Sequence, residues 1–219
     1  MNEPETPVRP AKPRFRGVSH QIAAFASLVL GVVLFALAST ASVRCAVLVY
    51  TLGLTAMYTT SALYHRGHWS DATRLRLRRL DHSMIMVAIA ATYTPIAVAA
   101  LDVSSARVLL AVVWSLAVVG VVLQMLWLNA PRWLVAVLYI AIGWTALAFS
   151  PTLWRDLGVV SFSLLVLGGV VYSLGAVVYS TRKPDPVPDV FGYHEVFHAL
   201  VIAAGLVFYV AIVRVVVKS

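Results

Sequence analysis

Seven long apolar segments, separated by short stretches that carry charge, glycine or proline, dominate this sequence of 219 residues. A helix needs about 20 mainly apolar residues to cross a bilayer, so seven such helices would use roughly 140 residues. Hydrophobic residues make up 61% of the chain and charged residues only 12%, against about 25% charged residues in a soluble domain. This apolar excess is too large for the core of one small domain, so the segments are expected to face lipid. A water-soluble globule is excluded.

The segments predict an all-α, polytopic membrane protein, a seven-transmembrane-helix bundle. Helices are favoured because each peptide group in lipid must find its hydrogen-bond partner within the protein. The expected helices lie at about 20–40, 44–65, 80–100, 106–128, 132–149, 157–180 and 193–216. They form a transmembrane domain over residues 19–217. Residues 1–18 are basic and rich in proline and are expected to form a disordered cytoplasmic tail.

Basic residues are distributed unequally between the two ends of the expected bundle. Twelve of the 17 Lys and Arg residues fall on one side, and they are Arg9, Lys12, Arg14, Arg16, Arg66, Arg74, Arg76, Arg78, Arg79, Arg132, Arg182 and Lys183. The other side has Arg44, Arg107, Arg155, Arg214 and Lys218. Since cytoplasmic connections carry the excess of basic residues, the N-terminus is predicted to be cytoplasmic and the C-terminus outside. The expected location is the plasma (inner) membrane, with multiple passes.

The second connection, residues 66–79, holds the densest group of basic residues. It is expected to contact anionic lipid headgroups, with each basic residue contributing about 1 kcal/mol near the surface. Topology and headgroup contact explain the net charge of +8, so no nucleic-acid partner is expected.

All six histidines fall at or near the cytoplasmic ends of the expected helices; they are His20, His65, His68, His82, His194 and His198. Ionisable groups in membrane spans usually face the bundle interior and mark functional sites. His194 and His198 are four residues apart, so they share one helix face with an axial separation of about 6 Å. With His65 they predict a metal site in which three neutral imidazoles and one water form an open, tetrahedral, catalytic arrangement.

Two further polar residues lie at the same depth. Asp81 either pairs with Arg78 or Arg79 at the helix end, or offsets the metal charge and acts as the base toward the metal-bound water. Ser61 lies one turn before His65 on the same helix face. It either packs between helices or orients the water or a substrate carbonyl.

The stretch from His194 to His198 also matches H-E-x-x-H, in which Glu195 would be the general base of a metalloprotease. Spacing alone leaves this alternative open. An intramembrane protease of this kind would take a third ligand from another helix.

Three separated motifs resemble those of the hemolysin III family, the bacterial branch of the progestin and adipoQ receptor superfamily. They are Ser61-Ala-Leu-Tyr-His65, Asp81-His82 followed by Thr92-Tyr-Thr-Pro95, and His194-x-x-x-His198. The motifs occur in the family's order, and the resemblance covers residues from about 16 to 217.

The resemblance implies a seven-helix bundle with a cytoplasmic N-terminus and a zinc ion near the inner face, held by His65, His194 and His198. Ser61 and Asp81 match the residues that contact the zinc-bound water, whereas Glu195 matches no expected metal-site residue. The superfamily includes alkaline ceramidases, which implies a zinc-dependent hydrolase of a lipid amide or ester with a membrane lipid as substrate. The hemolysin name implies the alternative, a pore-forming, cytolytic or receptor-like protein with a structural zinc.

Overall fold

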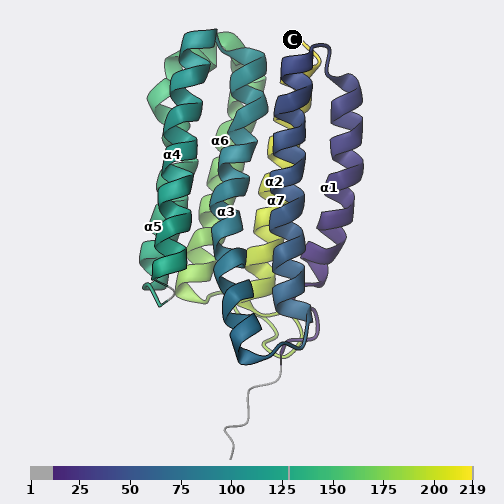
Figure 1. Cartoon of the computed structure of the whole chain (residues 1–219), viewed down its shortest axis with the longest axis vertical. Coiled ribbons are helices and arrows are strands. Elements are labelled where there is room, and N and C mark those ends of the chain that lie inside the picture. Colours follow the sequence, from purple (N-terminus) through teal and green to yellow (C-terminus); the bar gives the residue numbers. More distant parts are fainter. Residues whose placement is uncertain (1–11, 128, 219) are drawn as a thin grey trace, which may run out of the picture.

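The chain folds into a bundle of helices aligned along one axis (Figure 1). The computed structural model describes residues 12–127 and 129–218, so residues 1–11 of the expected tail lie outside the described part. The described residues form seven α-helices and one 3-10 helix and no β-strand, which confirms the all-α prediction. The helices are α1 (Val18–Leu37), α2 (Ala41–Arg66), α3 (Asp71–Ala100), α4 (Val103–Leu126), α5 (Arg132–Gly143), η1 (Thr145–Phe149), α6 (Ser150–Thr181) and α7 (Tyr193–Val216).

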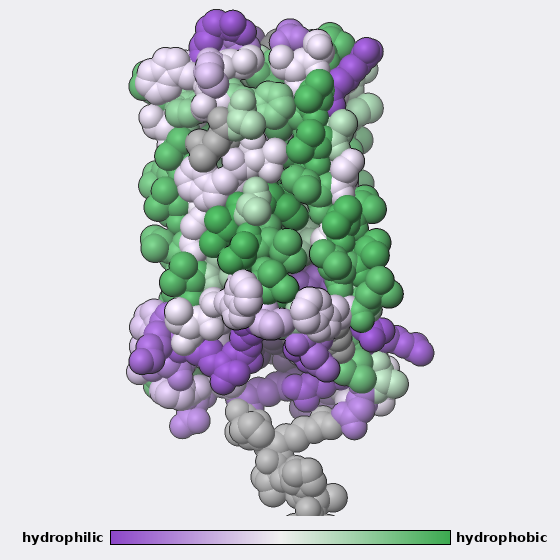
Figure 2. Space-filling model, turned by 90° about the vertical axis from the view of Figure 1, so that its left-hand side faces the viewer, coloured by the Kyte–Doolittle hydropathy of each residue, from purple (hydrophilic) through white to green (hydrophobic). Residues whose placement is uncertain are grey.

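Six of these helices, α1 to α4, α6 and α7, are long and apolar enough to cross a membrane. Their outer faces carry large apolar side chains in contact with the surroundings, such as Val32 at 70% and Phe25 at 69% exposure. On the face that Figure 2 shows, apolar residues form a band across the middle of the bundle, and hydrophilic residues gather at its two ends. The fold is therefore that of a multi-pass membrane protein.

The segment expected to form one helix over 132–149 is divided in the structure. α5 has 12 residues and ends at Gly143, and η1 follows it. The hydroxyl of Tyr93, on α3, occupies the break: it donates to the carbonyl oxygen of Gly143 (2.6 Å) and accepts from the amide of Ala146 (3.1 Å). A side chain from a neighbouring helix thus replaces backbone hydrogen bonds of the helix, which explains why the α-helix stops there.

The basic stretch expected as the second loop is helical, and this expectation was wrong. α3 begins at Asp71, because the hydroxyl of Ser70 accepts from the amide of Thr73 (3.4 Å) and Asp71 places a negative charge in the first turn. The connection between α2 and α3 is reduced to residues 67–70. Arg74, Arg76, Arg78 and Arg79 therefore lie on an extension of α3.

α6 also starts earlier than the expected 157–180. It begins at Ser150 and is interrupted at Gly158, whose φ of 71° lies in the left-handed region that glycine adopts without strain. The part after Gly158 corresponds to the expected apolar segment.

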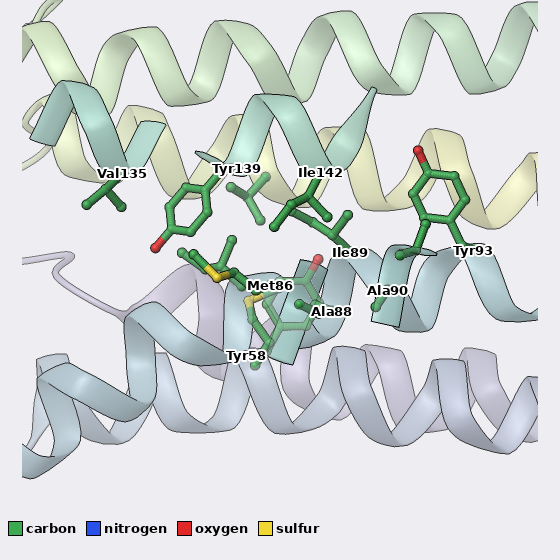
Figure 3. Close-up of a cluster of buried hydrophobic side chains, with 14 of the residues drawn as sticks. Tyr58, Met86, Ala88, Ile89, Ala90, Tyr93, Val135, Tyr139 and Ile142 are labelled. Carbon is green, nitrogen blue, oxygen red and sulfur yellow. The ribbon is translucent and has the colours of Figure 1, made fainter. Parts of the chain in front are cut away.

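The helices pack mainly against their neighbours in the chain, with α7 returning to contact α1 and α3. One end of the bundle brings together the start of α1, the end of α2, the start of α3 and the loop between α6 and α7 (Figure 1). The C-terminus and the turn between α1 and α2 lie at the opposite end. Inside, buried side chains form the core; in Figure 3, Tyr58, Met86 and Tyr139 turn toward the same interior space.

Close packing of α2 on α3 depends on Gly53, because a Cβ there would lie only 2.6 Å from the Cβ of Ala91. We expect Gly53→Ala to lower the free energy of unfolding by about 1–3 kcal/mol relative to Gly143→Ala, because it overpacks the helix interface. Gly143→Ala adds the same methyl group where nothing lies within 4 Å. Thermal unfolding of both variants in detergent measures the difference, and equal unfolding temperatures would contradict this account of the interface.

Candidate metal centre

Three histidines from two distant parts of the chain meet at the end of the bundle that contains the α6–α7 loop. His65 lies in the last turn of α2, and His194 and His198 lie in the first two turns of α7. One ring nitrogen from each lies within 4.8 Å of the other two, and His65 and His198 are buried. The Nε2 atoms of His65 and His194 are 2.9 Å apart. The trio predicted from spacing is therefore assembled in the structure.

The start of α7 sets the direction of two of these side chains. The carboxylate of Glu195 accepts from the amide of Gly192 (2.8 Å), and Asp185 accepts from the amide of Tyr193 (2.7 Å). These bonds satisfy amide groups that have no partner within the helix at its N-terminus. The helix therefore begins at Tyr193, and the four-residue spacing of His194 and His198 turns both imidazoles to the same side.

Asp81 and Ser61 lie beside the histidines. An oxygen of Asp81 is 3.8 Å from Nε2 of His65, and Asp81 and Ser61 line the same cavity. Both side chains are buried, with Asp81 at 7% and Ser61 at 2% exposure. Between the two alternatives for Asp81, this geometry favours a place in the centre over a pair with Arg78 or Arg79.

The residues present fit a divalent cation of the kind that imidazole binds. Two nitrogens of a tetrahedral site with bonds of about 2.0–2.1 Å are about 3.3 Å apart. The 2.9 Å between Nε2 of His65 and Nε2 of His194 is near this value, and the nitrogen of His198 lies within 4.8 Å of both histidines. Nδ1 of His198 is buried without a hydrogen-bond partner among the described residues. Asp81 supplies a negative charge nearby, while imidazole ligands suit zinc, copper, iron or nickel alike. The donor set could thus hold a metal ion, and it leaves the identity of the metal open.

Glu195, the central residue of the H-E-x-x-H match, has both carboxylate oxygens engaged outside the histidine cluster. One oxygen forms an ion pair with Nε of Arg16, and the other accepts from Gly192. A general base needs a free oxygen directed at the reacting water. Glu195 is therefore not placed to act as the general base that the motif suggests, because its oxygens bind Arg16 and the start of α7.

His20 belongs to the centre, although the sequence only placed it at the same end of the bundle. Its ring stacks on that of His198, with centroids 3.7 Å apart and planes at 10°, and its edge meets Tyr58. His20 is 2% exposed, and it lines one cavity with Ser61, Asp81, His194 and His198. The sequence signal that could have assigned His20 to the centre is that all six histidines lie near the same end of the expected helices. His68, by contrast, is exposed in the loop between α2 and α3.

A larger apolar cavity adjoins the polar one. The two cavities share Met57 and Val201 in their walls. The apolar cavity extends along the bundle between α2, α3, α5, η1, α6 and α7, and its lining includes Ile89, Phe162 and Phe208. A polar pocket lined by candidate metal ligands thus shares part of its wall with a space suited to a hydrocarbon chain.

Together these features define an all-helical membrane protein with a buried cluster of histidines at one end of the bundle. The family model described as "Haemolysin-III related" matches residues 8–209. The chain is 31% identical to the Hemolysin-3 homolog of Bacillus subtilis (strain 168) over 157 residues, which are 72% of this chain and 70% of that protein. It is 32% identical to Hemolysin-3 of Bacillus cereus over 169 residues, 76% and 77% of the two chains. The chain belongs to the haemolysin III family, as its three motifs predicted.

The cluster predicts that the purified protein binds one divalent metal ion per chain. We expect His65→Ala and His198→Ala each to weaken metal binding by more than about 100-fold, because each variant loses a ligand and not merely an outer partner. His68→Ala removes an exposed histidine from the adjacent loop and is expected to bind as the wild type does. Metal content by mass spectrometry and competition with a chelator measure the effect. Full metal content in both ligand variants would exclude this centre.

Proposed function

We propose that this protein is a zinc-dependent membrane hydrolase that cleaves an amide or ester bond in a lipid, as a ceramidase does. The observation that carries the proposal is one polar cavity beside an apolar cavity, with His194, His198, Ser61 and Asp81 in the polar lining and His65 next to His194. His65, His194 and His198 would hold the zinc ion. When bound by three neutral imidazoles, zinc lowers the pKa of its water to about 7 and polarises a carbonyl.

Asp81 serves as the general base in this proposal. Its carboxylate is buried, lies 3.8 Å from Nε2 of His65, and shares a cavity with Ser61. It takes a proton from the attacking water while the water oxygen bonds to the carbonyl carbon. The C–N or C–O bond then breaks, and Asp81 returns the proton to the leaving nitrogen or oxygen. The products are a carboxylic acid and an amine or alcohol.

The apolar cavity gives the proposal its substrate class. In the proposal its walls surround the hydrocarbon part of the lipid. Met57 and Val201, which line both cavities, lie where the lipid passes from the apolar cavity to the polar one. In this proposal the scissile bond lies at the depth of the histidines, near one end of the bundle. A membrane lipid therefore fits the two cavities better than a soluble substrate does.

We also propose a seven-span topology with the metal centre at the cytoplasmic face of the plasma membrane. α5 and η1 together extend for about 28 Å, close to the hydrocarbon thickness of about 30 Å. The metal centre lies at the end that carries most of the Lys and Arg residues. Residues 19–217 form the membrane domain and residues 1–18 a segment on the cytoplasmic side. The basic extension of α3 contacts anionic headgroups there.

The names of the relatives, Hemolysin-3 and a Hemolysin-3 homolog, suggest a second candidate. In this alternative the protein is cytolytic, pore-forming or receptor-like, and the zinc is structural. It predicts membrane permeabilisation or a ligand response that does not depend on Asp81.

Replacing Asp81 separates the two candidates. We expect Asp81→Asn to lower lipid turnover by about 10²–10⁴-fold, because the variant keeps the shape of the side chain but loses the base. The protein should keep its metal, because the three imidazoles remain. Untargeted lipid profiling of membranes incubated with the wild type and the variant, together with metal content, measures both effects.

Asp71→Asn is the matched control, since Asp71 is an exposed carboxylate in the first turn of the same helix. It is expected to turn over lipid at the rate of the wild type. Lipid profiles that do not differ between wild type and Asp81→Asn would refute the hydrolase. Membrane permeabilisation that survives Asp81→Asn would favour the second candidate.

A further inference from the structure

The six residues before α1, Lys12 to Gly17, lie across the end of the bundle at the metal centre, and we call them the N-terminal strap. They belong to the segment expected to be disordered, but the described part of that segment is tied down. The amide of Arg14 donates to the carbonyl oxygen of Asp189 (3.0 Å), and that of Phe15 donates to Val190 (3.2 Å). The strap is therefore fastened to the loop that leads into α7.

The strap also contacts the end of α2, where His65 lies. Nζ of Lys12 donates to the carbonyl oxygens of His65 (3.2 Å) and Gly67 (3.0 Å). Gly17 has a φ of 78°, and a Cβ at this position would lie 2.8 Å from the Cβ of His65. The backbone of the strap is thus fitted closely against a residue of the metal cluster.

One ion pair connects the strap to the other two histidines. Nε of Arg16 lies 2.5 Å from Oε1 of Glu195, which is situated between His194 and His198 in the first turns of α7. Glu195 is 2% exposed, so its charge requires a partner, and Arg16 supplies it. The second oxygen of Glu195 holds the amide of Gly192 at the start of the helix.

From these contacts we infer that Arg16 and Glu195 are positioning residues of the metal centre. Their ion pair holds the turn that carries His194 and His198 against a strap whose other contacts hold His65. The strap thereby fixes the two helix ends relative to each other, which determines the separation of the ligand nitrogens. This inference rests on the proposed metal site. It assigns to the glutamate of H-E-x-x-H the role of orienting ligands, with no part in proton transfer.

The test is a double-mutant cycle on metal affinity in the full chain. Arg16→Met removes the cation, and Glu195→Gln removes the negative charge while keeping an oxygen that accepts from Gly192. Outer partners of metal ligands contribute about 10–100-fold to affinity, so each variant is expected to bind Zn²⁺ about 10–100-fold more weakly. The double variant is expected to bind no more weakly than either single one, because one interaction is lost in all three. Chelator competition gives the affinities.

The visible spectrum of bound Co²⁺ provides a readout of ligand geometry that a loss of stability alone would not change. We expect the spectrum to change in Arg16→Met and Glu195→Gln, and to return toward that of the wild type in Arg16→Lys, which restores the cation. Arg14→Met is the control on the strap, because Arg14 is anchored through its backbone amide and its side chain is exposed. Its affinity and spectrum should match the wild type.

The outcomes separate this inference from the proposed function. Wild-type affinity and spectrum in both single variants would overturn the positioning role and leave the metal site intact, even if the unfolding temperature fell. Additive losses in the double variant would also overturn it. A wild-type protein that binds no Zn²⁺ would refute the metal site and this inference with it. If Arg16→Met does not fold, Glu195→Gln and Arg16→Lys carry the test.

Discussion

Peptide groups in the hydrocarbon interior of a bilayer find no water, so each must be hydrogen-bonded within the protein. Regular helices meet this requirement along most of the bundle. The place where helical bonding stops inside the apolar band, between α5 and η1, is the place where the Tyr93 hydroxyl contacts Gly143 and Ala146. Apart from the interruption of α6 at Gly158, the polar backbone groups without a helical partner elsewhere lie at the ends of helices, and one end of the bundle is also where the histidine cluster forms.

Two buried carboxylates near the cluster, Asp81 and Glu195, have different partners. Asp81 lies beside His65 and Ser61, with its charge directed at the cavity. Glu195 is adjacent to His194 in sequence, yet its oxygens contact Arg16 and Gly192. A buried charge must be compensated, and the group that compensates it decides what the charge can do. Proximity in sequence was the weaker guide here, since the better candidate for a base comes from another helix.

The predictions from sequence succeeded where one local property decides the outcome. Uninterrupted apolar runs indicated the long helices, and the four-residue spacing put His194 and His198 on one face. They failed where a second force competes. The charges of Arg74 to Arg79 suggested a loop, but a polar helix forms readily outside the membrane once Ser70 caps it. The break at Gly143 depends on a hydroxyl about 50 residues away in the chain, which no local pattern reveals.

The sequence by itself determined that this protein is helical and suited to a membrane, because the length of each apolar segment and the positions of the charged residues are local properties of the chain. It also identified the histidines of the candidate site, since residues so costly in a membrane span stand out from their surroundings. Only the tertiary structure decided which of the remaining polar residues join them. His20 stacks on His198, and Arg16 pairs with Glu195, because the starts of α1 and α7 meet at one end of the bundle. Such contacts arise from helix packing, which brings together residues that are far apart in sequence.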